Sequence, residues 1–244
     1  MNPEAYLEMA STESRHWWFA ARREILSRII EGLALPPSAR ILEAGSGTGG
    51  NLMMLSAYGL VSAIEMDEGA CAVSRLKTEG RFVIRQGCFP DDVPYEGETF
   101  DLIFMADVLE HVERNVETLV ALRRMLAPGG RMLITVPAYQ WLWSPHDVFL
   151  QHTRRYTSKS LRQVLMQAGL RVDRLSYFNA LLLPLAILAR VKDRMMWGGK
   201  SSGTTTPPAL VNRTLFSIFR SERRLLGRFN LPAGVSVLAI ARAE

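Results

Sequence analysis

The sequence predicts an α/β fold, a mostly parallel sheet with helices on both faces, and three observations support it. Short apolar runs of strand length alternate with segments whose apolar residues recur at helical spacing. A glycine-rich turn, GSGTGG at 45–50, joins the first strand to the helix that follows it. Two late strands, 171–178 and 234–243, break the alternation, because about 55 residues separate them.

The elements follow in order along the chain. One or two helices over 3–31 and the connector LALPPS precede the first strand. We expect strands at 39–44, 60–65, 81–86, 100–106 and 130–137, and helices at 50–58, 67–78, 113–126 and 158–168. Pro-Gly-Gly at 128–130 is expected to end the helix at 113–126, since Pro and Gly do not continue a helix. The long segment between the two late strands contains the stretch GGKSSGTTTPP and a helix over 209–229.

The 244 residues suit a single domain, because one hydrophobic core remains compact up to roughly 250 residues. We expect three parts: a helical N-terminal lid over 1–35, a core formed by 36–178 and 232–244, and an apolar and basic helical insert over 179–231. The composition, 48% hydrophobic and 22% charged, excludes a disordered chain and a coiled coil.

The positive charge is concentrated in the insert. Nine basic and two acidic residues give 190–231 a charge of +7, whereas the whole chain carries +5 and the rest therefore −2. Cys71 and Cys88 form no CxxC pair, which argues against a disulfide framework or a zinc site and favours a cytoplasmic location. The N-terminus does not look like a secretory signal. The longest uncharged run, 175–189, is shorter than the roughly 20 residues that span a bilayer.

The glycine-rich turn predicts a nucleotide-derived cofactor, and charge helps to decide which one. Its glycines allow a tight turn and the close approach of a ligand to the backbone. The stretch also fits the dinucleotide pattern GxGxxG, and Glu65 falls 20 residues after its first glycine, so an NAD site is an alternative. Glu43, two residues before the turn, would face the ligand, repel a pyrophosphate and attract the ammonium and sulfonium groups of S-adenosylmethionine.

The chain resembles the class I S-adenosylmethionine-dependent methyltransferases, and within them a bacterial, methyltransferase type 11-like group. Four motifs in family order carry the resemblance: ILEAGSGTGG at 41–50, AIEMD at 63–67, ETFDLIFMADVLEHV at 98–112 and LAPGGRMLITVP at 126–137. The resemblance implies a Rossmann-like seven-stranded sheet in the order 3-2-1-4-5-7-6, with strand 7 antiparallel. Such a sheet explains why the last two strands break the alternation.

The resemblance also implies a binding site for S-adenosylmethionine. The residues implied to hold its methionine part are Glu43, Gly45, Ser46, Gly47 and Gly49. Glu65 would bind the ribose, and Met66, Cys88 and Phe89 would border the adenine. The family often has Asp where Cys88 stands. Asp107, after the fourth strand, is expected either to contact the cofactor or acceptor or to cap the helix that follows.

Sequence identifies the catalytic base poorly, because methyl transfer is an in-line displacement that depends mainly on alignment. A base is needed only where the acceptor loses a proton. Our candidates are His111 and His146, with a structural hydrogen bond and pocket lining as the respective alternatives. His146, Asp147 and His152 can be read as metal ligands, but no spacing motif supports this reading, so no metal is expected.

Several aromatic and charged residues are expected to line the acceptor pocket: Trp17, Trp18, Arg22, Trp143, Asp147, Arg155 and Tyr156. Trp17 and Trp18 belong to an apolar cluster that either packs on the sheet edge or forms a lid over the site. Arg155 and Tyr156 either grip an anionic acceptor or belong to a solvated turn.

The helix expected at 209–229 is strongly amphipathic, with arginines opposite its apolar face. It resembles an interfacial anchor, which predicts contact with an anionic membrane surface. Glu222 lies within the apolar face and argues instead for packing on the protein's own body. The insert also offers a surface for oligomerisation. No RNA-binding motif is found, so no nucleic-acid partner is expected.

The sequence therefore predicts an S-adenosylmethionine-dependent methyltransferase that acts on an oxygen of a small-molecule or lipid-linked acceptor. Two alternatives stay open: an NAD-dependent oxidoreductase, and a non-catalytic membrane or assembly module built on a methyltransferase fold.

Overall fold

Seven strands form one sheet in the order β3-β2-β1-β4-β5-β7-β6. The computed structural model describes residues 3–95, 97–195 and 206–244. The strands are β1 (Arg40–Ala44), β2 (Leu60–Glu65), β3 (Val83–Gln86), β4 (Phe100–Ala106), β5 (Leu126–Pro137), β6 (Leu170–Phe178) and β7 (Ser236–Ala243). β7 pairs antiparallel with β5 and β6, and the remaining pairs are parallel. The predicted order and the antiparallel seventh strand are confirmed.

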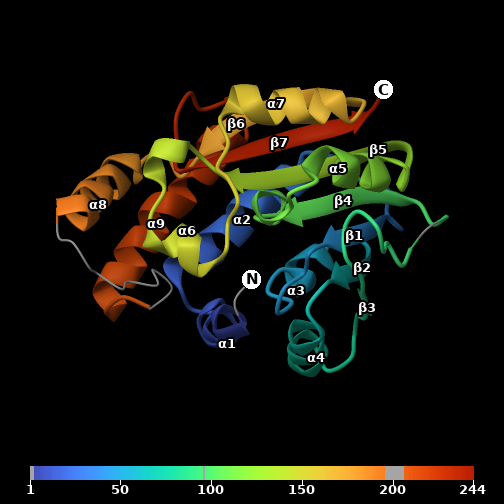
Figure 1. Cartoon of the computed structure of the whole chain (residues 1–244), viewed down its shortest axis with the longest axis horizontal. Helices are drawn as coiled ribbons and strands as arrows, with labels where there is room; N and C mark the ends of the chain where they lie inside the picture. Colours follow the sequence, from blue (N-terminus) through green and yellow to red (C-terminus); the bar gives the residue numbers. More distant parts are fainter. Residues whose placement is uncertain (1–2, 96, 196–205) are drawn as a thin grey trace.

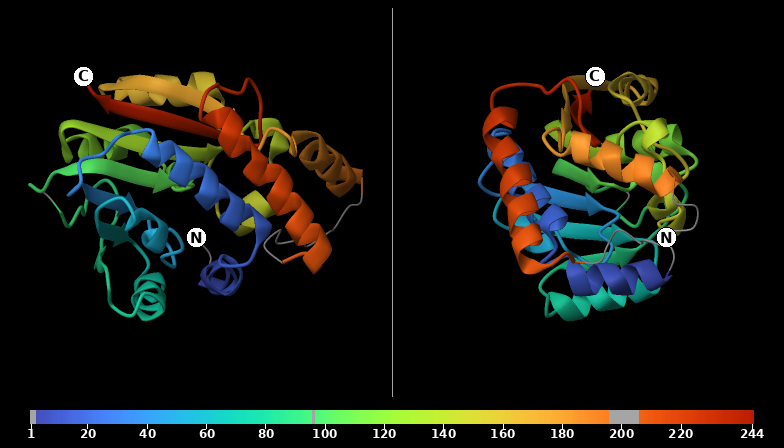
Figure 2. Two further views of the ribbon diagram at one scale, coloured as in Figure 1. Left: turned by 180° about the vertical axis from the view of Figure 1, so that it is seen from behind. Right: turned by 90° about the vertical axis from the view of Figure 1, so that its left-hand side faces the viewer.

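Helices cover both faces of the sheet (Figures 1 and 2). They are α1 (Pro3–Thr12), α2 (Trp17–Glu31), α3 (Leu52–Leu55), α4 (Glu68–Lys77), α5 (Asn115–Arg123), α6 (Pro145–Phe149), α7 (Ser158–Gln167), α8 (Leu183–Met195) and α9 (Ala209–Leu226), with 3₁₀ turns η1 (Leu109–His111) and η2 (Gln140–Leu142). α5 and α7 pack on one face, and α2, α3 and α9 pack on the other. The N-terminal segment thus forms two helices, separated at residues 13–16.

Several expected boundaries are wrong, and the helix expected over 209–229 ends at Leu226. The helix expected at 50–58 is shorter, because only Leu52–Leu55 are α-helical. The helix expected to run to 126 ends at Arg123, and β5 already begins at Leu126. Pro-Gly-Gly at 128–130 therefore lies within β5, where the pairing with β4 shifts register after Phe100. The run shapes the start of a strand rather than the end of a helix.

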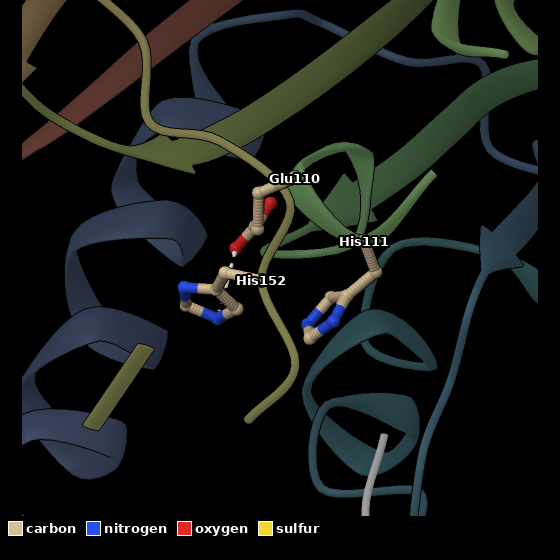
Figure 3. Close-up of side chains that lie close together, drawn as sticks. All are labelled: Glu110, His111 and His152. Atoms are coloured by element: carbon tan, nitrogen blue, oxygen red, sulfur yellow. Dashed lines mark ion pairs between the residues drawn. The ribbon is translucent and has the colours of Figure 1, made fainter. Parts of the chain in front are cut away.

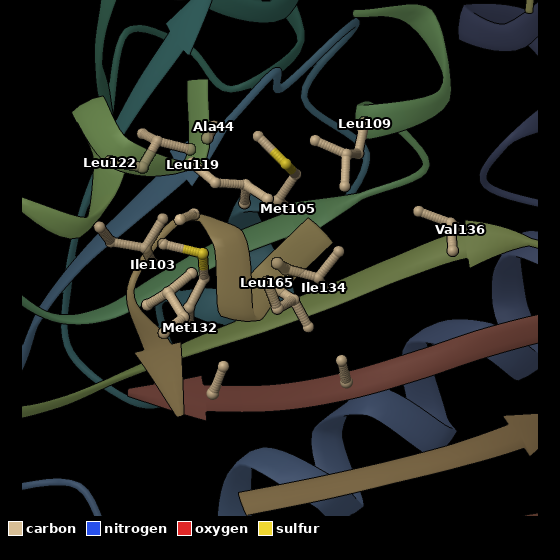
Figure 4. Close-up of a cluster of buried hydrophobic side chains, with 14 of the residues drawn as sticks. Ala44, Ile103, Met105, Leu109, Leu119, Leu122, Met132, Ile134, Val136 and Leu165 are labelled. Atoms are coloured by element: carbon tan, nitrogen blue, oxygen red, sulfur yellow. The ribbon is translucent and has the colours of Figure 1, made fainter. Parts of the chain in front are cut away.

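The core follows from the alternation of side chains along the strands. Leu42 and Ala44 point to the face covered by α5 and α7, whereas Ile41 points to the face covered by α2 and α3. Figure 4 shows the first of these clusters, in which Leu119 of α5 and Leu165 of α7 meet the strands. Each fully buried Leu or Ile contributes roughly 1.5–3 kcal/mol of transfer free energy. Burial on both faces fixes the sheet that positions the site.

The insert between β6 and β7 packs on the body through α9. Phe219 and Leu226 are fully buried beside α2, and Glu24 of α2 accepts hydrogen bonds from Arg220 and from Nη1 of Arg223. Glu222 is also fully buried, and its Oε1 accepts a hydrogen bond from the Leu181 backbone N–H at 2.8 Å. α9 therefore packs on the protein itself, as Glu222 indicated.

α8 lies at the end of the sheet toward which β4 points (Figure 1). Several apolar side chains in and before it are exposed: Leu181, Leu185, Leu188 and Val191. Residues 198–205 of the stretch GGKSSGTTTPP, which follows α8, lie outside the described residues. Among the helices that the structure describes, none combines the length and the hydropathy needed to cross a bilayer.

Candidate active site

A cavity of about 670 Å³ opens where the strand order reverses between β1 and β4. Open α/β sheets bind ligands in this position, outside the carboxyl ends of the strands. The cavity is lined by α1, the start of α2, the glycine-rich turn, the segments after β2, β3 and β4, and part of α8. Its volume is typical of small-molecule sites.

The glycine-rich turn is held against the sheet by its own backbone. The N–H groups of Gly45 and Ser46 both donate to the carbonyl oxygen of Ile64, at 2.9 and 3.0 Å. Gly45 has a φ of +79°, and a Cβ there would lie 2.6 Å from a methyl carbon of Val108. The first glycine is therefore required by both backbone conformation and packing.

Two further glycines of the turn, Gly47 and Gly49, differ in their surroundings. A Cβ on Gly49 would lie 2.2 Å from Oγ of Ser74, so this glycine allows the turn to pack on α4 and lies outside the cavity lining. Gly47 has a φ of +53° and lines the cavity, and a Cβ there would meet nothing within 4 Å. Gly47 therefore leaves its backbone open to a ligand.

Glu43 lies beneath this turn with 1% of its surface exposed. Its Oε1 accepts a hydrogen bond from Nδ2 of Asn51 at 2.8 Å, while Oε2 is buried and has no hydrogen-bond partner among the described residues. Burial raises the pKa of Glu43 to about 8. Glu43 does not line the cavity, so the expectation that its carboxylate faces the ligand directly is corrected. A buried carboxylate with a free oxygen below the turn nevertheless fits a cationic ligand above it.

Glu65, at the end of β2, joins three parts of the site. Its Oε2 accepts a hydrogen bond from the Gly47 N–H at 2.7 Å, and its Oε1 accepts from the Asp67 N–H and from the Tyr6 hydroxyl, both at 3.0 Å. Burial and the Glu65 carboxylate raise the pKa of Tyr6. Tyr6 brings α1 over the position expected for the ribose. Tyr6 is not predictable from local sequence patterns, because its partner Glu65 lies 59 residues further along the chain.

The residues expected at the adenine end lie together. Met66, Cys88 and Phe89 all line the cavity, and the thiol-bearing Cys88 is exposed. The backbone of Cys88 exchanges two hydrogen bonds with Asp92, each 2.8 Å long. This bridge fixes the segment after β3 as one wall of the cavity.

Arg22 and Asp107 form an ion pair between α2 and the end of β4. Asp107 has a φ of +56°, and its Oδ1 accepts a hydrogen bond from the Thr135 hydroxyl at 3.2 Å. Its side chain does not cap the following turn, whose N-cap is Val108, so the capping alternative is wrong. The guanidinium carbon of Arg22 lies 4.4 Å from the Trp18 ring centroid. Asp107 and Arg22 both line the cavity.

The aromatic cluster at the start of α2 contacts both α9 and the cavity. Trp17 packs edge-on against Phe219 of α9, with ring centroids 6.0 Å apart. The backbone N–H of Trp17 donates to Oδ1 of Asn212 at 2.8 Å. Trp17 and Trp18 also line the cavity. The first turn of α2 therefore packs on the body and forms part of the wall of the site.

Histidines and a buried carboxylate gather after β4 and α6 (Figure 3). Nδ1 of His152 lies 2.8 Å from Oδ1 of Asp147; because a carboxylate only accepts, this nitrogen carries the proton. Nε2 of His152 lies 4.0 Å from Oε1 of Glu110. The His111 ring meets the His152 ring edge-on at 4.7 Å. His111, His146, His152 and Glu110 all line the cavity.

His111 is a weak base in this environment. Burial and the neighbouring His152 lower the pKa of His111 to about 3, so its ring stays neutral at physiological pH. A nitrogen that binds a proton only near pH 3 accepts one poorly from an acceptor at neutral pH. Of the two histidines expected as the base, His146 remains the candidate. His111 is unsuited to that role.

Three residues expected in the acceptor pocket lie outside the cavity lining: Trp143, Asp147 and Tyr156. Asp147 is fully buried, caps α6 and receives two hydrogen bonds from Arg155, at 2.7 and 3.0 Å. Burial raises the pKa of Asp147, but hydrogen bonds from His152 and Arg155 outweigh it and leave the pKa below its usual range. The Tyr156 hydroxyl accepts from Asn115 at 3.0 Å inside the core. The prediction that these three residues line the acceptor pocket is therefore corrected, whereas Arg155 does line the cavity.

Comparison with known proteins identifies the architecture around this cavity. A family model described as a methyltransferase domain matches residues 17–175. The malonyl-[acyl-carrier protein] O-methyltransferase of Methylococcus capsulatus is 24% identical over 221 residues, which are 85% of this chain and 80% of that protein. The ubiquinone/menaquinone biosynthesis C-methyltransferase of Syntrophotalea carbinolica is 32% identical over 126 residues, or 49% of each chain.

Solved structures share the fold. A protein in complex with the Haloferax volcanii Trm112 methyltransferase activator superposes with a TM-score of 0.63 and 17% identity, over 99% of this chain and 94% of its own. An S-adenosylmethionine-dependent methyltransferase from Mesorhizobium loti gives a TM-score of 0.56 and 16% identity, over 88% and 95% of the two chains.

Proposed function

Because this chain belongs to the class I S-adenosylmethionine-dependent methyltransferases, we propose that it methylates an oxygen atom of a small-molecule or lipid-linked acceptor. The observation that carries the proposal is that the cofactor turn and α8 line the same cavity. Its lining includes Gly47 and Glu65 at the turn, and Leu182, Leu185 and Ala189 in and just before α8. An acceptor with an apolar part would lie along α8 with its polar end near the turn.

S-adenosylmethionine is the cofactor of the family, and it supplies a methyl group on a sulfonium. In the transfer, a lone pair of the acceptor oxygen forms the new C–O bond while the C–S bond breaks and its electron pair stays on sulfur. The chain's own contribution is to hold the two reactants in line and to keep water out. A hydroxyl acceptor also loses a proton, for which His146 is the proposed acceptor group.

The relatives support a small or carrier-linked acceptor and leave the attacked atom to experiment. The Methylococcus capsulatus relative is named as an O-methyltransferase of a malonyl-carrier substrate, whereas the Syntrophotalea carbinolica relative is a C-methyltransferase. The longer match favours oxygen, since it covers 85% of this chain rather than 49%. C-methylation is the competing outcome.

An assay with methyl-labelled cofactor separates these outcomes. Wild-type protein is incubated with pools of hydroxylated, carboxylated and quinol-type acceptors, and S-adenosylhomocysteine release is measured. We expect release to depend on an amphiphilic acceptor, and carbon-13 NMR of the product to place the label on oxygen. A label on carbon would refute O-methylation and leave the family assignment intact.

The exposed apolar side of α8 supports a location at the cytoplasmic face of a membrane. Leu188 is 66% exposed and does not line the cavity, so its side chain is free to enter a lipid interface. Basic residues of the insert would favour anionic lipid. An oligomer formed through the insert stays a further prediction, which light scattering tests.

Sedimentation with vesicles tests the membrane proposal. We expect co-sedimentation with anionic vesicles and loss of it in Leu188→Glu, because a carboxylate resists entry into acyl chains. Leu76→Glu is the matched control, since Leu76 is 82% exposed on α4, away from the insert. Equal background recovery of wild type with neutral and anionic vesicles would refute the location.

A further inference from the structure

We propose that Glu110, His111 and His152 bind a divalent metal ion at the acceptor end of the cavity. One ligand atom from each of these residues lies within 4.8 Å of the other two, and all three residues line the cavity. Two imidazoles and one carboxylate are a ligand set that zinc accepts when a further position stays open to a substrate. Zinc is therefore the ion to test first.

The Glu110 carboxylate is the observation that points to a missing ligand. Glu110 is fully buried, and neither of its oxygens has a hydrogen-bond partner in the part of the chain that the structure describes. A buried carboxylate without partners is unfavourable, because it loses its hydration and gains nothing in exchange. A cation between Glu110 and the two imidazoles supplies the missing interaction.

The two histidines are already oriented as metal ligands. His152 donates from Nδ1 to Asp147, which leaves Nε2 without a proton, 4.0 Å from Oε1 of Glu110 (Figure 3). This carboxylate–histidine arrangement is typical of metal sites, where the outer carboxylate fixes the ring and its tautomer. Nδ1 of His111 is buried without a hydrogen-bond partner in the described structure. Each ring therefore keeps one nitrogen available to a metal ion.

The local charge also suits a cation. Asp107 pairs with Arg22 and Asp147 pairs with Arg155, so the charges within each pair cancel. Ionised Glu110 leaves one uncompensated negative charge, and a bound divalent ion would turn it into a single positive one. Such a site would attract an anionic acceptor oxygen, and metal coordination lowers the pKa of a bound hydroxyl.

This role rests on the proposed methyl transfer, but the metal site itself does not. A bound metal ion would lower the pKa of an acceptor hydroxyl, whose proton would pass to His146, so His111 and His152 would act as ligands rather than as bases. The prediction that no metal is bound would then be wrong. The reason is that Glu110 and His152 are 42 positions apart, and no short spacing motif records their proximity.

Titration of the full chain with zinc chloride tests the proposal. Protein treated with a chelator and desalted is titrated by calorimetry, and metal content is checked by mass spectrometry. We expect about one zinc ion per chain in the wild type. Glu110→Gln and His152→Ala should weaken binding by more than the roughly 10–100-fold expected for Asp147→Asn, which removes only an outer partner. His146→Ala, a histidine of the same cavity outside the cluster, should bind zinc as the wild type does.

Binding of S-adenosylhomocysteine by each variant shows that it is folded and separates the two claims. Glu110→Gln keeps the shape of the side chain and breaks no hydrogen bond in the described structure. If His152→Ala misfolds, Glu110→Gln is therefore the variant that decides. Absence of stoichiometric zinc in the wild type, or equal zinc affinity in Glu110→Gln, overturns the metal site. Zinc binding without S-adenosylhomocysteine binding would instead contradict the proposed function.

Discussion

The hydroxyl of Tyr6 donates a hydrogen bond to Oε1 of Glu65 at 3.0 Å and so connects the first helix with the end of β2. Oε2 of the same carboxylate accepts from the Gly47 N–H at 2.7 Å. One carboxylate thus holds the N-terminal helix and the cofactor turn in a fixed relation. A ligand in the cavity meets all three residues, because each lines it.

Tyr6→Phe is expected to weaken S-adenosylhomocysteine binding by less than about tenfold. A neutral hydroxyl bonded to a charged group contributes roughly 1.5–3 kcal/mol, and Glu65 keeps its two backbone donors to offset part of the loss. Calorimetry measures the affinity, with Tyr58→Phe as control because the Tyr58 hydroxyl donates to the Ser27 carbonyl, outside the site. A variant that bound no cofactor at all would show that Tyr6 contacts the ligand directly.

Substitutions of the first two glycines in the turn should separate stability from binding. Gly45→Ala combines positive φ with a clash against Val108, for which overpacking costs about 1–3 kcal/mol. Gly47→Ala carries only the backbone strain, since its Cβ would meet open space. Thermal unfolding should show a lower Tm for Gly45→Ala, at about 2–4 °C per kcal/mol. Equal Tm values, or unchanged cofactor affinity in Gly47→Ala, would contradict the assigned roles.

Cofactor binding should tighten as the pH rises from 6 toward 7.5. Burial raises the pKa of unliganded Glu43 to about 8, with Asn51 and Arg22 favouring and Glu13 and Glu65 opposing ionisation. A cationic ligand favours the ionised form of Glu43, so binding lowers this pKa and releases a proton. The affinity for the cofactor therefore rises by at most about tenfold per pH unit. The amino group of the cofactor stays protonated in this window, below roughly pH 7.7. Glu43→Gln should bind with little pH dependence, and a pH profile as steep as that of the wild type would assign the proton elsewhere.

Glu222→Gln should stabilise the protein at pH 8 and do so less at lower pH. Burial raises the pKa of Glu222, so the folded state holds its proton more tightly than the unfolded state does. The wild type therefore gains stability as the pH falls through the folded pKa toward the unfolded value, and the glutamine variant lacks this gain. We expect thermal unfolding to show a higher Tm than the wild type at pH 8 and a smaller difference at lower pH. A pH-independent difference would mean that Glu222 is not the titrating group.

The sheet and the cofactor turn follow from local patterns. Alternating apolar runs predict the strands. The position of Gly45 requires a residue without a Cβ, because its φ is positive and a Cβ there would clash with Val108. Long-range contacts have no such pattern. The Trp-rich loop around Asp147 predicts a pocket residue, but in the fold its carboxylate is hydrogen-bonded to Arg155 and His152 instead. Glu110 likewise becomes a candidate only when folding buries both of its oxygens beside a histidine from another loop.

Titration of wild type and Glu65→Ala with S-adenosylhomocysteine tests the assigned site most directly. We predict one ligand per chain in the wild type and an affinity at least about tenfold lower in the variant, since a charge-assisted hydrogen bond contributes roughly 1.5–3 kcal/mol. Glu68→Gln, an exposed carboxylate three residues further on, should bind as the wild type does. No binding by the wild type, or equal affinity in Glu65→Ala, would contradict the account.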